Sequence, residues 1–368
     1  MIKNHNPNCK DIGIIGGGVI GATTAFYLAK AGHNIHIFDP ELNQPILTTN
    51  SLTGTKASLG IIMGNIFRRS SGRSWKLRQR SMALWPNLIR EISTSKYSFN
   101  IETPLIQLAT SYKEAELMKG LADKRFDLGL KVLDKNDKGP QERIWPTNLY
   151  GGLISEKDGR INPLKLLYNL FIYLKKLKVV SVNKNVSFLT RQLTNNQVIW
   201  NIHLDNDKKF QKDIVIICAA LGSEHLLKKF GYKIPLEPIL GQGLELNIKE
   251  VSGDWNEWPS VLISNGVALI PQTKNKLLMG ATIEPGIKPS EIHLEEMLKM
   301  NGIAPHWIKT AQISNHWFGV RAKPKNRPAP VLEVLEKGLI INAAHYRNGI
   351  LLAPACAEWV LSQIENVP

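Results

Sequence analysis

The sequence predicts an α/β protein in which a Rossmann-type nucleotide-binding domain is interleaved with a mixed, mainly antiparallel second domain. Three observations predict this fold class. A glycine-rich turn joins an apolar run to a helix near the N-terminus, continuous apolar strands return in the middle of the chain, and short strands punctuated by proline and glycine follow them. A chain of 368 residues is long enough for about two such domains.

The N-terminal unit has the spacing of a dinucleotide-binding strand–helix–strand motif. Residues 11–15 form a short apolar run typical of a buried parallel strand, residues 22–31 have helical spacing, and residues 34–38 return as a second strand. Asp39 ends that strand, 18 residues after the last glycine of the turn. The turn itself reads G-x-G-x-x-G, with its glycines at Gly16, Gly18 and Gly21.

Each part of this unit has a physical role in holding a pyrophosphate. Gly16 permits the tight turn, Gly18 lets the backbone approach the phosphates, and Gly21 allows the helix to pack closely on the strand. The amides and the dipole of the helix then face the phosphates. Asp39 can accept hydrogen bonds from an adenosine ribose. The unit therefore predicts a site for FAD or NAD, and the motif alone does not choose between them.

The remainder of the chain does not continue as a simple series of strand–helix units. Residues 41–64 are rich in Thr, Ser, Asn and Gly without helical spacing, so they form either a ligand-contacting loop or an ordinary surface loop. Asn162 and Pro163 are good N-cap and N1 residues for a helix. Residues 213–220 form another continuous apolar strand, and residues 231–318 contain the short strands of the second domain.

Two motifs near the C-terminus carry a family resemblance. Residues 317–321 read W-F-G-V-R, and residues 345–355 read H-Y-R-N-G-I-L-L-A-P-A. With these motifs and the glycine turn, the chain resembles the FAD-dependent D-amino-acid oxidase superfamily, and most closely the glycine oxidases. The resemblance covers essentially the whole chain and implies non-covalently bound FAD. It implies an FAD-binding domain of residues 1–80, 151–230 and 318–368, and a substrate domain of residues 81–150 and 231–317.

The resemblance also implies which residues meet the cofactor and the substrate. Arg321 and Arg347 would meet the substrate carboxylate. Val186 resembles the residue whose backbone holds the adenine side, and residues 345–351 would wrap the isoalloxazine end. No metal site is expected. The full set implied for FAD is Gly16, Gly18, Val19, Ile20, Gly21, Asp39, Pro40, Thr55, Leu59, Gly60, Ile61, Val186, Gly222, His345, Tyr346, Arg347, Asn348, Gly349, Ile350 and Leu351.

The chemistry of these residues agrees with the implied roles. A planar guanidinium is a natural bidentate ligand for a carboxylate, although a surface salt bridge is the alternative interpretation of Arg321 and of Arg347. The amides that begin the helix after Asn348 would place a positive dipole end near the flavin O2. His345 is either packed beside the flavin through its backbone or a catalytic base. Pro354 is expected in about the first turn of the helix.

The chain departs from the glycine oxidase pattern near the substrate. Ala268 stands where the family has a tyrosine that helps to bind the carboxylate. Ala322 replaces the proline that follows the family's arginine, and Asn326 replaces a later aspartate. The missing hydroxyl removes one hydrogen bond, about 1–3 kcal/mol if the site is desolvated. The identity of the substrate therefore stays open. Whether Tyr112, Tyr150 or Tyr346 replaces the missing tyrosine from another part of the chain also stays open.

These features predict FAD-dependent oxidative deamination of a small amino acid or amine, such as glycine, sarcosine or a small D-amino acid. A hydride would pass from the substrate Cα to flavin N5, and the imine would hydrolyse to a 2-oxo acid and ammonia. Oxygen would reoxidise the flavin and yield H2O2. Two other functions stay open, namely a tRNA-modifying flavin amine oxidase and a flavin-binding protein without turnover.

The formal net charge of +15 permits an acidic partner, but the basic residues are dispersed, as on a solvated lysine-rich surface. We therefore expect a small amine or amino acid as the partner rather than a nucleic acid, and a homo-oligomer is compatible with the sequence. We expect no membrane span, because the sequence has no window of about 18 uncharged apolar residues. We expect no signal peptide, because residues 1–10 lack an apolar core. A cytoplasmic location is the resulting prediction.

Overall fold

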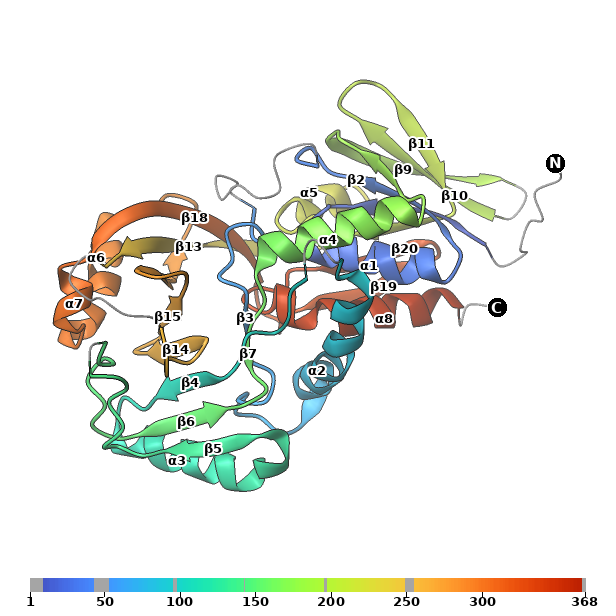
Figure 1. Cartoon of the computed structure of the whole chain (residues 1–368). Helices are drawn as coiled ribbons and strands as arrows, with labels where there is room; N and C mark the ends of the chain where they lie inside the picture. Colours follow the sequence, from blue (N-terminus) through green and yellow to red (C-terminus); the bar gives the residue numbers. More distant parts are fainter. Residues whose placement is uncertain are drawn as a thin grey trace.

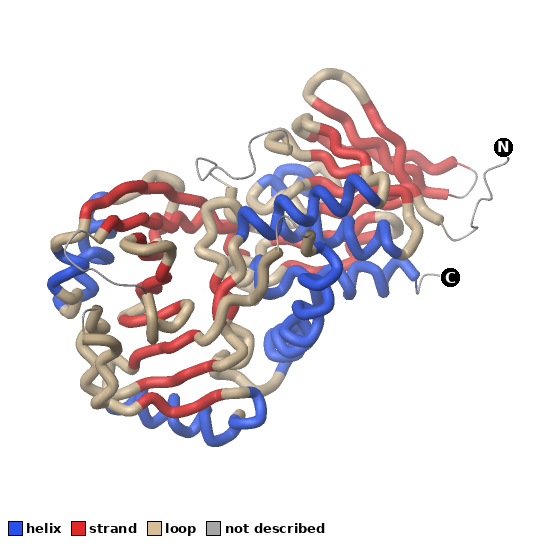
Figure 2. Tube along the Cα trace, viewed as in Figure 1, coloured by secondary structure: helices blue, strands red, loops and turns tan. Residues whose placement is uncertain are grey.

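The computed structural model describes residues 9–42, 53–94, 98–141, 143–194, 197–248 and 255–365. Figure 1 shows two lobes, one built around a mostly parallel sheet and the other around a larger, curved sheet. Figure 2 shows helices and strands in both lobes. The α/β class predicted from the sequence is confirmed. No described helix is long and apolar enough to cross a membrane.

The first lobe contains a six-stranded sheet in the order β19-β20-β12-β1-β2-β8. Neighbours from β20 to β8 are parallel, whereas β19 is antiparallel to β20. The parallel strands are continuous apolar runs because both faces of the sheet are covered. Their bounds are β1 (Asp11–Ile15), β2 (Asn34–Phe38), β8 (Val180–Val182), β12 (Ile214–Ile217), β19 (Val331–Glu336) and β20 (Leu339–Ala343).

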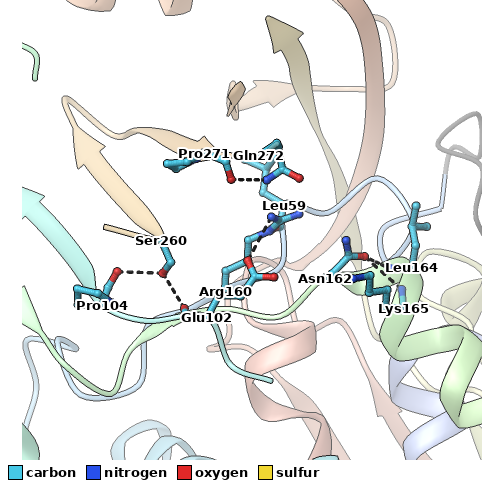
Figure 3. A network of polar contacts seen from close by, with 10 residues as sticks. All are labelled: Leu59, Glu102, Pro104, Arg160, Asn162, Leu164, Lys165, Ser260, Pro271 and Gln272. Carbon is cyan, nitrogen blue, oxygen red and sulfur yellow. Dashed lines mark hydrogen bonds and ion pairs between the residues drawn. The ribbon is translucent and has the colours of Figure 1, made fainter. Parts of the chain in front are cut away.

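Helices cover one face of this sheet. Ile12 and Ile14 of β1 share a core with apolar side chains of four helices. The predicted start of one of them is observed: Asn162 Oδ1 accepts the backbone N–H groups of Leu164 and Lys165 at 3.1 Å (Figure 3). The four helices are α1 (Val19–Lys30), α2 (Gly72–Ile92), α4 (Pro163–Lys176) and α8 (Gly349–Glu365).

A small antiparallel sheet covers the other face, where Trp200 and Ile202 pack with Ile15 and Phe38. Its strands follow the order β11-β10-β9 (Figure 1). Their bounds are β9 (Val186–Thr194), β10 (Gln197–Leu204) and β11 (Lys209–Lys212), with the short helix α5 (Gly222–Lys228) in the same layer. The parallel sheet is therefore the middle of three layers.

The second lobe is a nine-stranded sheet in the order β17-β13-β16-β15-β14-β4-β6-β5, with β18 paired to β13. Most neighbours are antiparallel, but β14 and β4 are parallel. Its strands are β4 (Leu105–Leu108), β5 (Leu130–Leu133), β6 (Gly152–Ser155), β13 (Leu236–Asn247), β14 (Val261–Ser264), β15 (Val267–Pro271), β16 (Lys276–Gly280), β17 (Glu284–Pro285) and β18 (Gln312–Pro324). Its helices are α3 (Tyr112–Lys124), η1 (Phe126–Leu128), α6 (Glu291–Lys299), η2 (Met300–Gly302) and α7 (His306–Lys309).

Three of the expected domain boundaries differ from the elements that the structure shows. The boundary at 80/81 falls inside α2, which packs on α8. The boundary at 150/151 assigns β6 to the FAD-binding part, although β6 pairs with β4 and β5 of the larger sheet. The boundary at 317/318 falls inside β18. Sequence patterns miss these points because the elements pass from one lobe to the other without a break.

Candidate active site

A cavity of about 1350 Å³ is lined by both lobes. Typical small-molecule sites enclose roughly 300–1,000 Å³, so this cavity has room for a dinucleotide together with a small substrate. Of the predicted site residues, Gly21 and Leu351 do not line it. Those that line it are Gly16, Gly18, Val19, Ile20, Asp39, Pro40, Thr55, Leu59, Gly60, Ile61, Val186, Gly222, Arg321, His345, Tyr346, Arg347, Asn348, Gly349 and Ile350.

The glycine turn forms one end of the cavity from bare backbone. Gly16 has a φ of +110°, and a Cβ there would lie 2.4 Å from the carbonyl oxygen of Cys218. Gly21 lies behind the turn, where a Cβ would lie 1.9 Å from the carbonyl oxygen of Gly16. Thr55 Oγ1 accepts the backbone N–H of Val19 at 3.2 Å and so joins the turn to the next wall. An open cradle at the start of α1 fits the pyrophosphate of a dinucleotide.

Asp39 closes this end from the carboxyl end of β2. Its Oδ2 accepts the backbone N–H of Gly17 at 2.7 Å, and its Oδ1 accepts that of Glu41 at 2.8 Å. Each oxygen keeps a further lone pair that can accept a ribose hydroxyl. The carboxylate therefore shapes the turn in addition to the ligand role expected from the sequence.

A second wall, residues 59–69, is held from both sides by buried side chains. The Asp158 carboxylate accepts the backbone N–H groups of residues 64–66 at 2.9–3.0 Å. The Arg125 guanidinium donates to three backbone carbonyls of residues 65–69. Burial raises the pKa of Asp158, while these N–H groups lower it. These bonds to backbone donors and acceptors from two buried side chains hold the segment as a fixed wall.

Arg160 holds the start of the same wall. Its Nε donates to the carbonyl oxygen of Leu59 at 3.0 Å, and its guanidinium lies 3.5 Å from the Glu102 carboxylate (Figure 3). The two short strands β3 (Ile61–Ile62) and β7 (Gly159–Arg160) pair antiparallel at this point. Leu59, Gly60 and Ile61 are thus fixed against the cavity by the segment that leads into α4.

The turn before α8 forms a further wall of the cavity, and its backbone is unusual. Ala344 and Tyr346 both have φ near +55°, a left-handed conformation that costs non-glycine residues energy. The Tyr346 N–H donates to the Ala322 carbonyl at 3.2 Å, and the Asn348 N–H donates to that of His345 at 3.1 Å. These bonds fix the turn, and the residues that begin α8, Gly349 and Ile350, line the cavity. Pro354 lies in the second turn of α8, one turn later than expected.

His345 is buried in this turn. Its Nε2 has no hydrogen-bond partner among the described residues. Burial, with a smaller contribution from Arg73, lowers the pKa of His345 to about 3. The imidazole is therefore neutral and weakly basic at neutral pH, which supports the packing role over the role of catalytic base.

Arg321 reaches the cavity from β18. One guanidinium nitrogen donates to the carbonyl oxygens of Leu240 and Thr282, both at 3.2 Å. The guanidinium rests on the backbone of Gly241, where a Cβ would lie 2.1 Å from its Nη2. Burial, and then the charge of Arg347, lowers the pKa of Arg321. No carboxylate of the described chain forms an ion pair with Arg321, so its remaining donors are available to a ligand.

The other predicted carboxylate ligands differ in position. Arg347 lines the cavity but is exposed, which places it at the rim. Ala268 lines the cavity at the position of the family's tyrosine. Tyr346 lines it too, whereas Tyr112 and Tyr150 are exposed and do not. Of these three tyrosines, Tyr346 alone lines the cavity.

Sequence reasoning missed a buried polar network beneath Arg321. The Glu284 carboxylate accepts Gln242 Nε2 and the backbone N–H of Ser290, both at 2.8 Å, and the hydroxyl of Thr282. The carbonyl of Thr282 is one of the two that hold Arg321. Gln242 and Glu284 lie on separate strands, so the short Thr-x-Glu pattern at residues 282–284 is the one local signal that could have indicated this network. The hydrogen bonds among Gln242, Thr282 and Glu284, all buried, hold in place the backbone on which the Arg321 guanidinium rests.

A three-layer nucleotide-binding lobe, a backbone cradle for a pyrophosphate and a second lobe that places a half-buried cation in the cavity define a dinucleotide-dependent enzyme. Comparison with known families specifies the cofactor. Residues 11–363 match the model described as "FAD dependent oxidoreductase", the DAO family. The chain belongs to this family, and it is an FAD-dependent oxidoreductase. The resemblance drawn from the sequence motifs is confirmed.

Curated relatives and solved structures agree with this assignment. The glycine oxidase of Geobacillus kaustophilus is 25% identical over 97% of this chain and 93% of its own. The glycine oxidase of Bacillus subtilis is 22% identical over 96% and 92%. The crystal structure of the Geobacillus kaustophilus enzyme superposes with a TM-score of 0.81 at 23% identity, covering 98% of this chain and 95% of the other.

Proposed function

We propose that this FAD-dependent oxidoreductase oxidises the amine of a small amino acid, and that Arg321 binds the substrate carboxylate. The observation that carries this proposal is the half-buried Arg321 guanidinium, which lines the cavity without an ion-pair partner in the described chain. A buried cation is costly unless an anion meets it, and an amino-acid carboxylate is such an anion. The glycine oxidases among the relatives support the same substrate class.

FAD, when bound, supplies the acceptor for a hydride from the substrate Cα, and oxygen is proposed as the final electron acceptor. The chain's own part is to bind and orient. The glycine turn would hold the pyrophosphate, Asp39 the ribose, and the start of α8 the isoalloxazine edge. With the carboxylate on Arg321, the Cα–H bond has one fixed direction, which is the positioning that such a reaction needs.

This chemistry requires no protein base at the reacting carbon. The neutral amine of the substrate donates its electron pair as the hydride leaves, and water then converts the imine to a 2-oxo acid and ammonia. Oxygen takes up two electrons and two protons to give H2O2. The low pKa of His345 agrees with this route, because a neutral, weakly basic imidazole leaves orientation as the main contribution of the chain.

Anaerobic reduction of the flavin tests the proposal. Purified holoenzyme is mixed with glycine, sarcosine and D-alanine, and with methylamine, dimethylamine and ethylamine, which lack only the carboxylate. We expect at least one amino acid to bleach the oxidised flavin absorbance, and its matched amine to fail at the same concentration.

Two results would overturn it. A flavin that every compound leaves oxidised would indicate a binding protein without turnover. Equal bleaching by an amino acid and its matched amine would remove the carboxylate, and with it Arg321, from substrate recognition.

A further inference from the structure

The buried cation Arg78 has no place in the function described so far. It lies on α2 and is only 7% exposed, yet no carboxylate of the described chain forms an ion pair with it. Its guanidinium lies 3.9 Å from the ring centre of Phe67, and both residues line the cavity. Its Nε is buried and has no hydrogen-bond partner in the described chain.

The arginines of α2 contrast with one another. Arg80, two residues further on, is exposed and pairs with Glu358. Within the described part of the chain, Arg78 makes hydrogen bonds only to neutral acceptors, the carbonyl of Ser74 at 3.3 Å and Oδ1 of Asn348 at 3.0 Å. Burial accordingly lowers its pKa, although an arginine stays protonated. A cation left in this state within a cavity wall points to an anion that the ligand supplies.

The hydrogen-bond partner of Arg78, Asn348, indicates where in the cavity that anion would lie. Asn348 immediately precedes α8, and its carbonyl accepts the N–H of Leu352 in the first turn. The first amides of a helix have no acceptors within the helix and carry its positive dipole end. The Arg78 charge and this dipole end therefore reinforce one another at one wall of the cavity. Arg321 and the glycine turn, which would hold the substrate carboxylate and the pyrophosphate, belong to other walls.

We propose that Arg78 is a positioning and electrostatic residue that, through Asn348 and the first turn of α8, favours the reduced, anionic form of the bound flavin over its oxidised form. This inference rests on the placement of the isoalloxazine edge against residues 345–350 in the proposed function. The charge is fixed before the reaction by Phe67 and Asn348, so no reorganisation is needed when negative charge develops.

The midpoint potential of the bound flavin tests the proposal, and it is measured by equilibration with a reference dye in the absence of substrate. By linkage, this potential reports the ratio of the affinities for reduced and oxidised flavin. A merely structural defect weakens both affinities alike and leaves the potential unchanged. For Arg78→Gln holoenzyme we expect the ratio of reduced to oxidised flavin at a given potential to fall at least about tenfold, about 30 mV for a two-electron couple.

Three further variants complete the test. Arg78→Met is the second neutral replacement if the Gln variant does not accumulate, because an unbranched apolar side chain suits a buried helix position. Arg78→Lys retains the charge and should shift the ratio less than about threefold. Arg80→Gln removes one charge from the same helix at an exposed position and should leave the potential unchanged.

Two results would contradict the proposal. One is a neutral variant that binds FAD and keeps the wild-type midpoint potential. Such a variant contradicts the proposal even if it raises the KM for substrates that carry a second acid group. The other is a Lys variant that shifts the potential as far as the neutral ones. Because no substrate enters the measurement, a failure here is distinct from a failure of the amine panel.

Discussion

At the scale of single residues, the carboxylate site depends on backbone atoms as much as on charge. Two carbonyl oxygens and the bare Cα of Gly241 hold the Arg321 guanidinium, and Glu284 lies one layer further away. A guanidinium held by neutral acceptors keeps most of its charge for a ligand, whereas an ion pair would neutralise it. The absence of a side chain at residue 241 is therefore part of the site.

Gly241→Ala tests this point. The new Cβ would lie 2.1 Å from Arg321 Nη2, so the flexible guanidinium must move while the fold is retained. We expect the dissociation constant of the reducing substrate to rise at least about tenfold, equivalent to about 1.4 kcal/mol, with normal FAD content. Rapid-mixing anaerobic reduction gives that constant.

Gly120→Ala on α3 is the matched control, because a Cβ there meets nothing within 4 Å and alanine is the better helix former. Wild-type substrate affinity in Gly241→Ala would show that the guanidinium does not need its present position.

At the scale of elements, the sequence predicts what local patterns encode. The strand at Asp11–Ile15, the cap at Asn162 and the strand Ile214–Ile217, within the apolar run of residues 213–220, follow from continuous hydrophobicity and capping chemistry. The wall at residues 59–69 could not be predicted, because its order comes from Asp158 and Arg125, far away in the chain. The left-handed turn before α8 is fixed by contacts with β18 and likewise leaves no local signal.

The buried histidine of that turn gives a pH dependence with a definite sign. The pKa of His345 is about 3 in the folded protein and 6.5 when unfolded, so the unfolded chain binds the additional proton as the pH falls below 6.5. Its contribution to stability is complete above pH 6.5 and is lost between pH 6.5 and 3. From pH 7 to pH 5 the free energy of unfolding should fall by about 2 kcal/mol more in wild type than in His345→Gln, measured by urea unfolding of the holoenzyme.

His293→Gln changes an exposed position of α6 and serves as the control. Its free energy of unfolding should fall from pH 7 to pH 5 by as much as that of wild type. An identical pH dependence in wild type and His345→Gln would show that the imidazole is not held in its neutral form.

At the scale of the whole molecule, β13 and β18 join the two lobes. They pair antiparallel from Leu236–Pro324 to Asn247–Gln312, and the same ribbon carries Gly241 and Arg321 into the cavity. Such a pairing joins strands far apart in the sequence. The motif W-x-G-x-R therefore identified Arg321 but not the β13 backbone at Leu240 and Gly241 that the guanidinium contacts. The formal net charge of +15 gave no information about the cavity, whose arginines differ in exposure: Arg78 is buried, Arg321 is half-buried and Arg347 is exposed.

The affinity of the reducing substrate for Arg321→Ala tests the central claim most directly. Rapid-mixing anaerobic reduction is compared with wild type and with Arg327→Ala, which removes a charge paired to Glu333 just beyond β18. Loss of one partner of a buried charge pair costs about 2–5 kcal/mol, so the dissociation constant should rise between about 30-fold and several thousand-fold in Arg321→Ala alone. An unchanged dissociation constant in Arg321→Ala would contradict the account.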